Sequence, residues 1–244
     1  MPPRLTLCVI ARDAAATLGE CLASGAVVAD ELLVVDTGSG DNTPGVAQRL
    51  GARILSFPWQ DDFALARNFA LEQATGDWVL YLDADEVLFA EDGPLVRELV
   101  QKEETEAYFI HIHNLVDARG REVVSPAVRL LRRRPEYRWT GRVHEQILPS
   151  IVAAGLGRVE MSGVRLRHYG YLPEEVAGRE KIRRNLRLLE LELSERPGDP
   201  FTLFNLGVEK QRLGLLEEAL ACFEKARPGL PPTLGFVHLL EKRR

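Results

Sequence analysis

Short apolar runs alternate with helical patterns along the first hundred residues. The apolar runs, which we expect to form strands, cover residues 5–10, 31–36, 53–57 and 78–83. The helical patterns between them cover residues 14–25, 43–51 and 62–74. Strands that are apolar throughout and separated by helices are typical of a parallel sheet covered on both faces. The pattern therefore predicts an α/β layer structure.

The alternation changes after residue 105. Further strand-like runs follow without helices between them, at residues 107–116, 127–134, 145–152 and 163–171. Glycine and proline separate these runs, which predicts a mixed or antiparallel extension of the sheet. From Pro173 onward the pattern is helical. We therefore expect two domains, residues 1–172 and residues 173–244.

The helical tail contains a repeat-like pattern. Small and apolar residues and a closing proline occur at the spacing of a tetratricopeptide helix-turn-helix unit, at Leu206, Gly207, Gly214, Ala219, Phe223, Ala226 and Pro231. Counting back by one repeat length from Pro231 reaches Pro197, so the preceding segment resembles the second helix of a degenerate unit. A single repeat is rarely stable alone. We expect the tail to pack on the rest of the chain, on a partner protein or on another copy.

Composition and charge exclude some classes of protein. The 244 residues are 45% hydrophobic and 27% charged, which is ordinary for a globular protein. The formal net charge of −5 leaves no broad basic excess for binding nucleic acid. Three cysteines without metal-ligand spacing indicate a reducing environment, and no apolar run approaches the roughly 20 residues of a transmembrane helix. We expect a cytoplasmic protein, and docking on the inner face of the membrane through a partner stays open.

Acidic side chains gather where the fourth strand-like run ends. In GDWVLYLDADE (residues 76–86), Asp83 and Asp85 point to the same side if the chain stays extended. Ligands of α/β sheets bind at the carboxyl ends of the strands. Mg²⁺ or Mn²⁺ commonly combines one or two such carboxylates with phosphate oxygens of a substrate. An acidic loop that caps the following helix is the alternative.

Four motifs occur in order around this segment. They are LTLCVIARD (5–13), DELLVVDTGSGDNT (30–43), FPWQDDFALARNFAL (57–71) and GDWVLYLDADE (76–86). Over residues 5–172 the chain resembles family 2 glycosyltransferases. The sequences of its motifs are similar to those of a bacterial subgroup with tetratricopeptide tails. The resemblance implies the GT-A fold, a Rossmann-like mixed sheet, with a small all-α tail. It also implies a nucleotide-diphosphate sugar as donor, with UDP as the expected nucleotide.

The resemblance implies nucleotide-sugar contacts at Ala11, Asp13, Asp36, Arg67 and Asp83. It assigns Asp36 to the base or ribose, Arg67 to the diphosphate, and Asp83 to the ribose or, through water, to the metal. Many relatives have Asn-Glu where this chain has Asp13 and Ala14, so the contribution of Asp13 stays open. From the residues alone, Asp36 also fits an Asx turn, and Arg67 fits a helical arginine paired with an acid.

The metal ligands implied by the resemblance are Asp85, as the direct ligand of Mn²⁺ or Mg²⁺, and His168 as a further ligand or diphosphate contact. A lone histidine beside a tyrosine is more often a hydrogen-bonded structural residue, and this alternative stays open. Glu86 is expected to be a flanking residue or the first residue of a helix. Asp61 or Asp62 is expected to cap the helix that carries Arg67.

YRWTGRVHEQI (residues 137–147) matches a second landmark of the subgroup. Sugar transfer with inversion needs a base to take the proton of the acceptor. The resemblance makes Glu145 the first candidate for this base and His144 the second. Trp139 is a candidate for stacking on the acceptor or sugar ring. A structural His-Glu pair and a core tryptophan are the alternatives.

Two further clusters carry polar side chains of interest. RLLRRR (129–134), followed by Arg138, forms a basic patch that suits a diphosphate or an anionic acceptor, although a solvated strand edge is the plainer interpretation. His111 and His113 alternate along one strand face, and we interpret them as structural or acceptor-side residues.

The sequence therefore predicts a metal-dependent inverting glycosyltransferase, of the hexosyltransferase type, that acts on a glycan, lipid or peptide acceptor. One alternative is a catalytically silent scaffold that works through the tetratricopeptide-like tail. The other is a sugar nucleotidyltransferase, although those enzymes normally carry a glycine-rich basic stretch after the first strand. Residues 9–18, VIARDAAATL, contain no such stretch.

Overall fold

A computed structural model describes residues 1–115, 121–169 and 175–230 of the chain. It contains two compact units, Met1–Thr140 with Gln146–Leu172, and Gly141–Glu145 with Pro173–Arg244. The boundary expected between residues 172 and 173 lies outside the described residues, as does Pro231. Within the described ranges, no helix is both long and apolar enough to cross a membrane.

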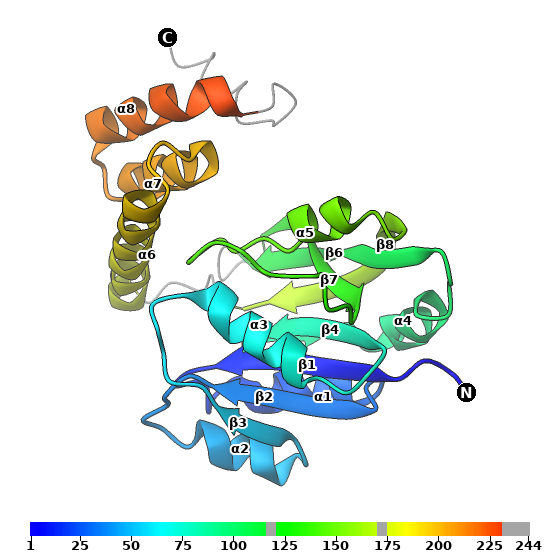
Figure 1. Ribbon diagram of the computed structural model, residues 1–244. Helices are drawn as coiled ribbons and strands as arrows, with labels where there is room; N and C mark the ends of the chain where they lie inside the picture. The colour runs from blue at the N-terminus through cyan, green and yellow to red at the C-terminus, as the bar shows by residue number, and fades with distance from the viewer. Residues whose placement is uncertain (116–120, 170–174, 231–244) are drawn as a thin grey trace. The chain divides into compact units, whose positions relative to one another are not determined.

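The first unit contains one eight-stranded mixed sheet (Figure 1). In order across the sheet, its strands are β3 (Arg53–Ser56), β2 (Glu31–Asp36), β1 (Leu5–Ala11), β4 (Trp78–Asp83), β7 (Glu122–Arg132), β6 (Thr105–Leu115), β8 (Arg158–His168) and β5 (Glu86–Leu88). The first four are parallel, and β7 joins β4 in antiparallel orientation. Strand β6 pairs antiparallel with β7 and parallel with β8. The predicted α/β fold class, with a parallel first half and a mixed extension, is confirmed.

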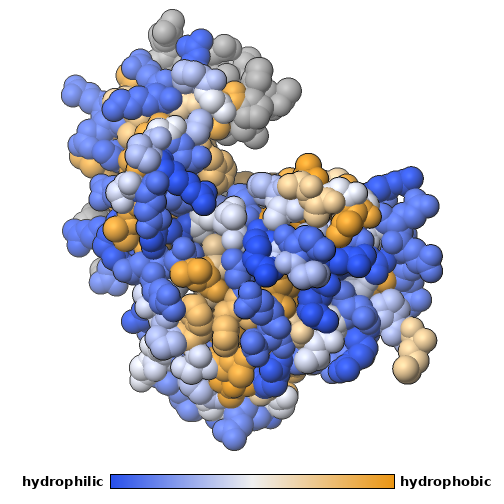
Figure 2. Space-filling model, viewed as in Figure 1, coloured by the Kyte–Doolittle hydropathy of each residue, from blue (hydrophilic) through white to orange (hydrophobic). Residues whose placement is uncertain are grey.

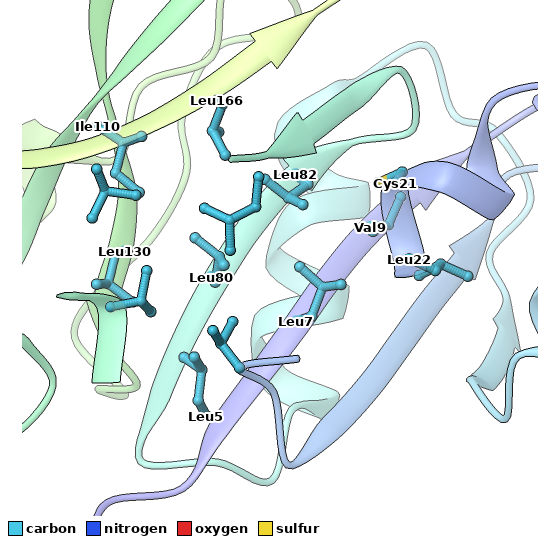
Figure 3. Close-up of a cluster of buried hydrophobic side chains, with 14 of the residues drawn as sticks. Leu5, Leu7, Val9, Cys21, Leu22, Leu80, Leu82, Ile110, Leu130 and Leu166 are labelled. Atoms are coloured by element: carbon cyan, nitrogen blue, oxygen red, sulfur yellow. The ribbon is translucent and has the colours of Figure 1, made fainter. Parts of the chain in front are cut away.

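Helices pack on both faces of this sheet and bury two apolar clusters. The helices are α1 (Leu18–Ala26), α2 (Thr43–Arg49), α3 (Phe63–Gln73), α4 (Gly93–Leu99) and α5 (Leu148–Ala154), and a short 3₁₀ turn, η1 (Ala90–Asp92), precedes α4. Successive side chains of a strand point to opposite faces. Leu7 and Val9 of β1 therefore join Leu22 of α1 in one cluster (Figure 3), whereas Cys8 joins Ala70 of α3 in the other. Burial on both faces explains why the first strands are apolar throughout.

Two local predictions were wrong. Residues 145–152 were expected to form a strand, but α5 begins at Leu148 with a proline in its first turn, where the missing N–H costs nothing. Gly155, with φ 63°, ends this helix in the left-handed conformation. Glu86 does not start a helix, because it is the first residue of β5 and pairs with His168 of β8.

The second unit contains three helices, α6 (Glu175–Glu195), α7 (Pro200–Arg212) and α8 (Leu216–Ala226), followed by a 3₁₀ turn, η2 (Arg227–Gly229). Helices α7 and α8 form a helix-turn-helix, and a Cβ at Gly207 of α7 would lie 2.5 Å from the ring of Phe223 of α8. Gly214, with φ 79°, forms the turn between them. Hydrophilic residues cover most of this unit in the view of Figure 2. The predicted all-α extension is confirmed.

Candidate active site

The carboxyl ends of three parallel strands meet at one edge of the sheet. Ala11 at the end of β1 pairs with Asp36 at the end of β2, and Ile10 pairs with Asp83 at the end of β4. The sheet therefore brings Ala11, Asp36 and Asp83 to neighbouring positions. This is the edge at which open α/β sheets bind their ligands.

Hydrogen bonds connect the loops that follow β1 and β2. Asp13, with φ 51°, donates its backbone N–H to Ser39 Oγ at 3.0 Å and accepts the N–H of Gly40 at 2.7 Å. The carboxylate of Asp36 accepts the hydroxyl of Ser39 at 2.5 Å and its N–H at 3.2 Å. The side chain of Asp36 thus closes a turn onto Ser39, three residues along the chain rather than the two of an Asx turn. A carboxylate has about four lone-pair positions, so the turn does not exhaust its capacity to accept hydrogen bonds.

Asp83 lies between two arginines. Its Oδ1 accepts from Arg67 at 2.6 Å, and its Oδ2 accepts from Arg129 at 2.7 Å. Arg129 also donates to Glu86 Oε1 at 2.8 Å, and Glu86 Oε2 accepts the backbone N–H of Asp83 at 2.9 Å. Arg67, Arg129 and Glu86 are buried. These four side chains form a connected charged cluster at the end of β4, which we call the Asp83 cluster.

The Asp83 cluster separates the pKa values of its two carboxyls. Burial would raise the pKa of Asp83, but the charges and hydrogen bonds of Arg129 and Arg67 outweigh it and hold this pKa well below its ordinary value. Burial raises the pKa of Glu86 to about 7, with help from the charge of Asp83 and against the lowering effect of Arg129. Asp83 therefore stays ionised, whereas Glu86 takes up or releases a proton near neutral pH.

Asp85 and His168 face each other beside this cluster. The His168 Nε2 atom lies 3.3 Å from Asp85 Oδ2, and the other ring nitrogen, Nδ1, lies 2.8 Å from Asn114 Oδ1. Asn114 donates its amide group to the carbonyls of Ile112 and Val123, so its Oδ1 is fixed as an acceptor. His168 must therefore donate from Nδ1.

This donor pattern leaves two states for the imidazole. In the neutral ring, Nε2 presents its lone pair to the Asp85 carboxylate, an arrangement that suits a cation bound by both groups. In the charged ring, Nε2–H donates to Asp85. Burial would lower the pKa of His168, but the hydrogen bond to Asp85 and the charges of Asp85, Glu86 and Asp83 raise it. One carboxylate and one imidazole fit Mn²⁺ or Mg²⁺ when phosphate oxygens and water supply the remaining ligands. Among the described residues, no group of three or more His, Cys, Asp and Glu is placed to hold a metal.

Arg67 and Trp139 lie in the core beneath the edge. The Arg67 guanidinium carbon is 5.0 Å from the ring centre of Trp139 and 5.6 Å from that of Tyr81. Trp139 is buried and packs edge-on against Tyr81. Asn68 fixes its backbone through two hydrogen bonds, at 2.8 and 2.9 Å. The helix that carries Arg67 and Asn68 is capped by Asp62, as predicted, since its side chain accepts the N–H of Leu65. The structure brings Arg67 to Asp83 and gives Trp139 the position of a core residue.

The candidate bases lie on a segment of the second unit, Gly141–Glu145. His144, with φ 57°, places Nε2 3.5 Å from Glu209 of α7. The backbone N–H of Arg142 donates to Glu192 Oε2 of α6 at 2.9 Å. Glu145 is neither buried nor fully exposed. The His144 imidazole is thus paired with a glutamate of the same unit.

The sequence reasoning missed Arg129 and Asn114. Arg129 was counted in a basic patch, and the alternative of a solvated edge is wrong because β7 lies between β4 and β6. The sequence did contain an indication of this role, because Arg129 stands among the apolar residues of a buried strand, AVRLL (127–131). A buried arginine requires an acidic partner nearby. The other arginines of the patch bind protein groups, as Arg134 binds Glu106 at 2.8 Å. His113 lies 2.8 Å from Glu122 at the neighbouring strand, which agrees with a structural role.

Comparison with known proteins identifies the family. The model of glycosyl transferase family 2 matches residues 6–143. A TPR repeat-containing protein of Synechococcus elongatus is 37% identical over 84% of this chain and 51% of its own length. Glycosyltransferase SunS of Bacillus phage SPbeta is 26% identical over 92% of this chain and 53% of its own length. The chain therefore spans about half the length of these curated relatives.

A solved structure supports the fold over a longer range. The crystal structure of S. aureus TarS 1-349 superposes with a TM-score of 0.55 and 14% identity, over 96% of this chain and 74% of that chain. At this identity the likeness concerns the fold alone. The family model covers more than half of the chain and includes β1 to β4 with the edge described above. This chain belongs to glycosyl transferase family 2 and has the GT-A fold.

Proposed function

We propose that this chain is a metal-dependent inverting glycosyltransferase that transfers a sugar from a UDP-sugar to an acceptor nucleophile. The observation that carries the proposal is the pair formed by Asp85 and His168. Their facing atoms are 3.3 Å apart, and Asn114 fixes the imidazole so that Nε2 is directed at the carboxylate. The pair lies at the sheet edge where family members are expected to bind a nucleotide sugar.

Asp85 and His168 are the residues that we assign to Mn²⁺ or Mg²⁺. When bound, such an ion neutralises the charge that develops on the leaving diphosphate. Asp83 stays ionised beside it because Arg129 and Arg67 hold its pKa low. We assign Asp83 to the donor ribose or to a metal-bound water, and its fixed orientation by two arginines suits either contact.

The loops after β1 and β2 are assigned to the nucleotide. Asp36 accepts from the base or ribose, and Ala11 and Asp13 line the same edge. Arg67 is assigned to the diphosphate, but in this structure its guanidinium donates to Asp83. A diphosphate contact by Arg67 therefore requires its fork to be shared between Asp83 and the donor, which the five donors of a guanidinium permit.

Glu145 is assigned as the base that takes the acceptor proton, with His144 as the second candidate. An inverting transfer needs this base because the acceptor attacks in a single displacement. Trp139 is the weakest assignment, since its burial fits a core residue better than a sugar platform. Residues 1–172 are proposed as the donor-binding domain. Residues 173–244 are proposed as a tail that positions a partner protein or the acceptor. A glycan, a lipid and a peptide are the acceptor classes to be tested.

A panel of nucleotide sugars tests the proposal. Thermal unfolding is measured with each sugar nucleotide, with and without Mn²⁺, and hydrolysis of the donor is measured without acceptor. We expect a UDP-sugar to stabilise the protein only when Mn²⁺ is present, and Asp85→Ala to abolish both effects. Glu98→Gln, at an exposed position of α4, is the matched control and should behave like the parent. Equal turnover by Asp85→Ala and the parent would remove the metal assignment, and no stabilisation by any donor would favour the silent scaffold.

A further inference from the structure

Three glutamates of the helical tail hold the segment that carries the candidate base. Glu192 and Glu195 lie on α6, Glu209 lies on α7, and the segment is Gly141–Glu145. All of these residues belong to the second unit. We call the three glutamates the tail acids.

Each tail acid holds a different group of the segment. Glu192 accepts the backbone N–H of Arg142 at 2.9 Å. Glu195 forms an ion pair with the guanidinium of the same arginine. Glu209 lies 3.5 Å from the imidazole of His144. The backbone and side chain of Arg142 and the side chain of His144 thus all contact helices of the tail.

The surroundings of Glu209 indicate that its carboxylate is built for this contact. The side chain is fully buried in the second unit, and Asn185 of α6 donates to its Oε1 at 2.9 Å. Arg212 of α7 lies 3.3 Å from the same carboxylate. Burial would raise the pKa of Glu209, but hydrogen bonds from His144 and Asn185 and the charge of Arg212 lower it. A buried carboxylate without these partners would be strongly destabilising, so they keep it ionised at neutral pH.

The backbone of the segment needs such support. His144 has φ 57°, a left-handed conformation that is unfavourable for a residue with a side chain, whereas Gly141, with φ 98°, adopts its conformation without strain because it has none. A conformation of this kind persists only where the surrounding structure determines it. At the base of the segment, Thr140 and Gln146 exchange two backbone hydrogen bonds, at 3.0 and 2.9 Å. Between these two residues, the tail acids contact Arg142 and His144.

We propose that the tail is a positioning element for catalysis, in which Glu209, with Glu192 and Glu195, fixes the segment that carries Glu145. The catalytic part rests on the assignment of Glu145 as the base in the proposed function. A misplacement of a reacting group by about 1 Å lowers a rate by about a hundredfold.

Hydrogen exchange tests the positioning without any substrate. In the parent, the amide of Arg142 should exchange slowly because it donates to Glu192. Glu209→Gln, which keeps the shape and removes the charge, should speed exchange across residues 141–145. Glu217→Gln, at an exposed position of α8, is the matched control. Unchanged exchange in Glu209→Gln would overturn the proposal. If this variant fails to fold, Glu195→Gln provides the same test, because that side chain is 56% exposed.

Donor hydrolysis tests the catalytic consequence. We expect Glu209→Gln to lower kcat by about tenfold to a hundredfold while the affinity for UDP with Mn²⁺ stays at the parent value. A loss of UDP affinity together with kcat would indicate general damage and would overturn the proposal. If Glu145→Gln is impaired but Glu209→Gln is not, the positioning role fails and the base assignment stands. If Glu145→Gln turns over like the parent, the base assignment in the proposed function fails, and the exchange experiment still decides whether the tail holds the segment.

Discussion

Glu86 is expected to make the stability of the first unit depend on pH near neutrality. Its pKa lies at about 7 in the folded chain against an ordinary value of 4.5, because burial and the charge of Asp83 outweigh the effect of Arg129. Between these two values the folded state binds more protons than the unfolded state, so stability falls as pH rises. The effect of Asp83 has the opposite sign. Because its pKa is lowered in the folded state, Asp83 stabilises that state at pH values above its ordinary pKa, and this stabilisation is lost as the pH falls.

The magnitude follows from the two pKa values. A tenfold change in proton affinity corresponds to about 1.4 kcal/mol, so the full effect is roughly 3 kcal/mol. Between about pH 5.5 and pH 7.5 the free energy of unfolding should fall by about 2 kcal/mol through Glu86 alone. Glu86→Gln removes the titrating group. The variant is expected to lose this part of the pH dependence, whatever its absolute stability.

The assay is urea unfolding followed by tryptophan fluorescence at both pH values. The three tryptophans of the chain, Trp59, Trp78 and Trp139, all belong to the first unit, so their fluorescence reports on that unit. His168 also has a raised pKa and contributes a loss of the same sign, and because the charge of Glu86 is one cause of that shift, Glu86→Gln reduces this contribution as well. The same pH dependence in parent and Glu86→Gln would refute the reasoning and show that Arg129 keeps Glu86 ionised throughout.

Two further predictions concern the metal pair and the tail. Asn114→Ala removes the acceptor that orients His168 and should weaken Mn²⁺ binding by about tenfold to a hundredfold in calorimetry, while parent-like affinity would show that Asn114 does not orient the ligand. Gly207→Ala should destabilise the tail by roughly 1–3 kcal/mol in circular dichroism melts, because the added Cβ would lie 2.5 Å from the ring of Phe223. Combining it with Phe223→Leu should restore part of this loss, and additive effects of the two changes would contradict the clash.

The apolar pattern predicted the sheet and its edge because a strand that is buried on both faces appears in the sequence as a continuous run of apolar residues. It failed at residues 145–152, where a proline and a glycine delimit a helix too short to show a helical period. Strand β5 has three residues and was equally invisible as a pattern.

The sequence motifs predicted the carboxylates of the site, Asp83 and Asp85, but not the side chains that contact this site. Arg129 and Asn114 are 46 and 29 residues away from Asp83 and Asp85, respectively, and only the order of β4, β7, β6 and β8 brings them together. The assignment of Glu209 lies beyond any local pattern, since its partner His144 is distant in the sequence.

The pairing of Thr140 with Gln146 has a consequence for how such chains diversify and can be recombined. A hybrid made by joining residues 1–172 of this chain to the helices of a relative would set foreign side chains against Arg142 and His144. The five residues Gly141–Glu145 and the helices of the tail form one structural unit, although they are two separate pieces of the sequence. Grafts that exchange both pieces together, with Thr140 and Gln146 as the splice points, are expected to remain active where single-junction hybrids are not.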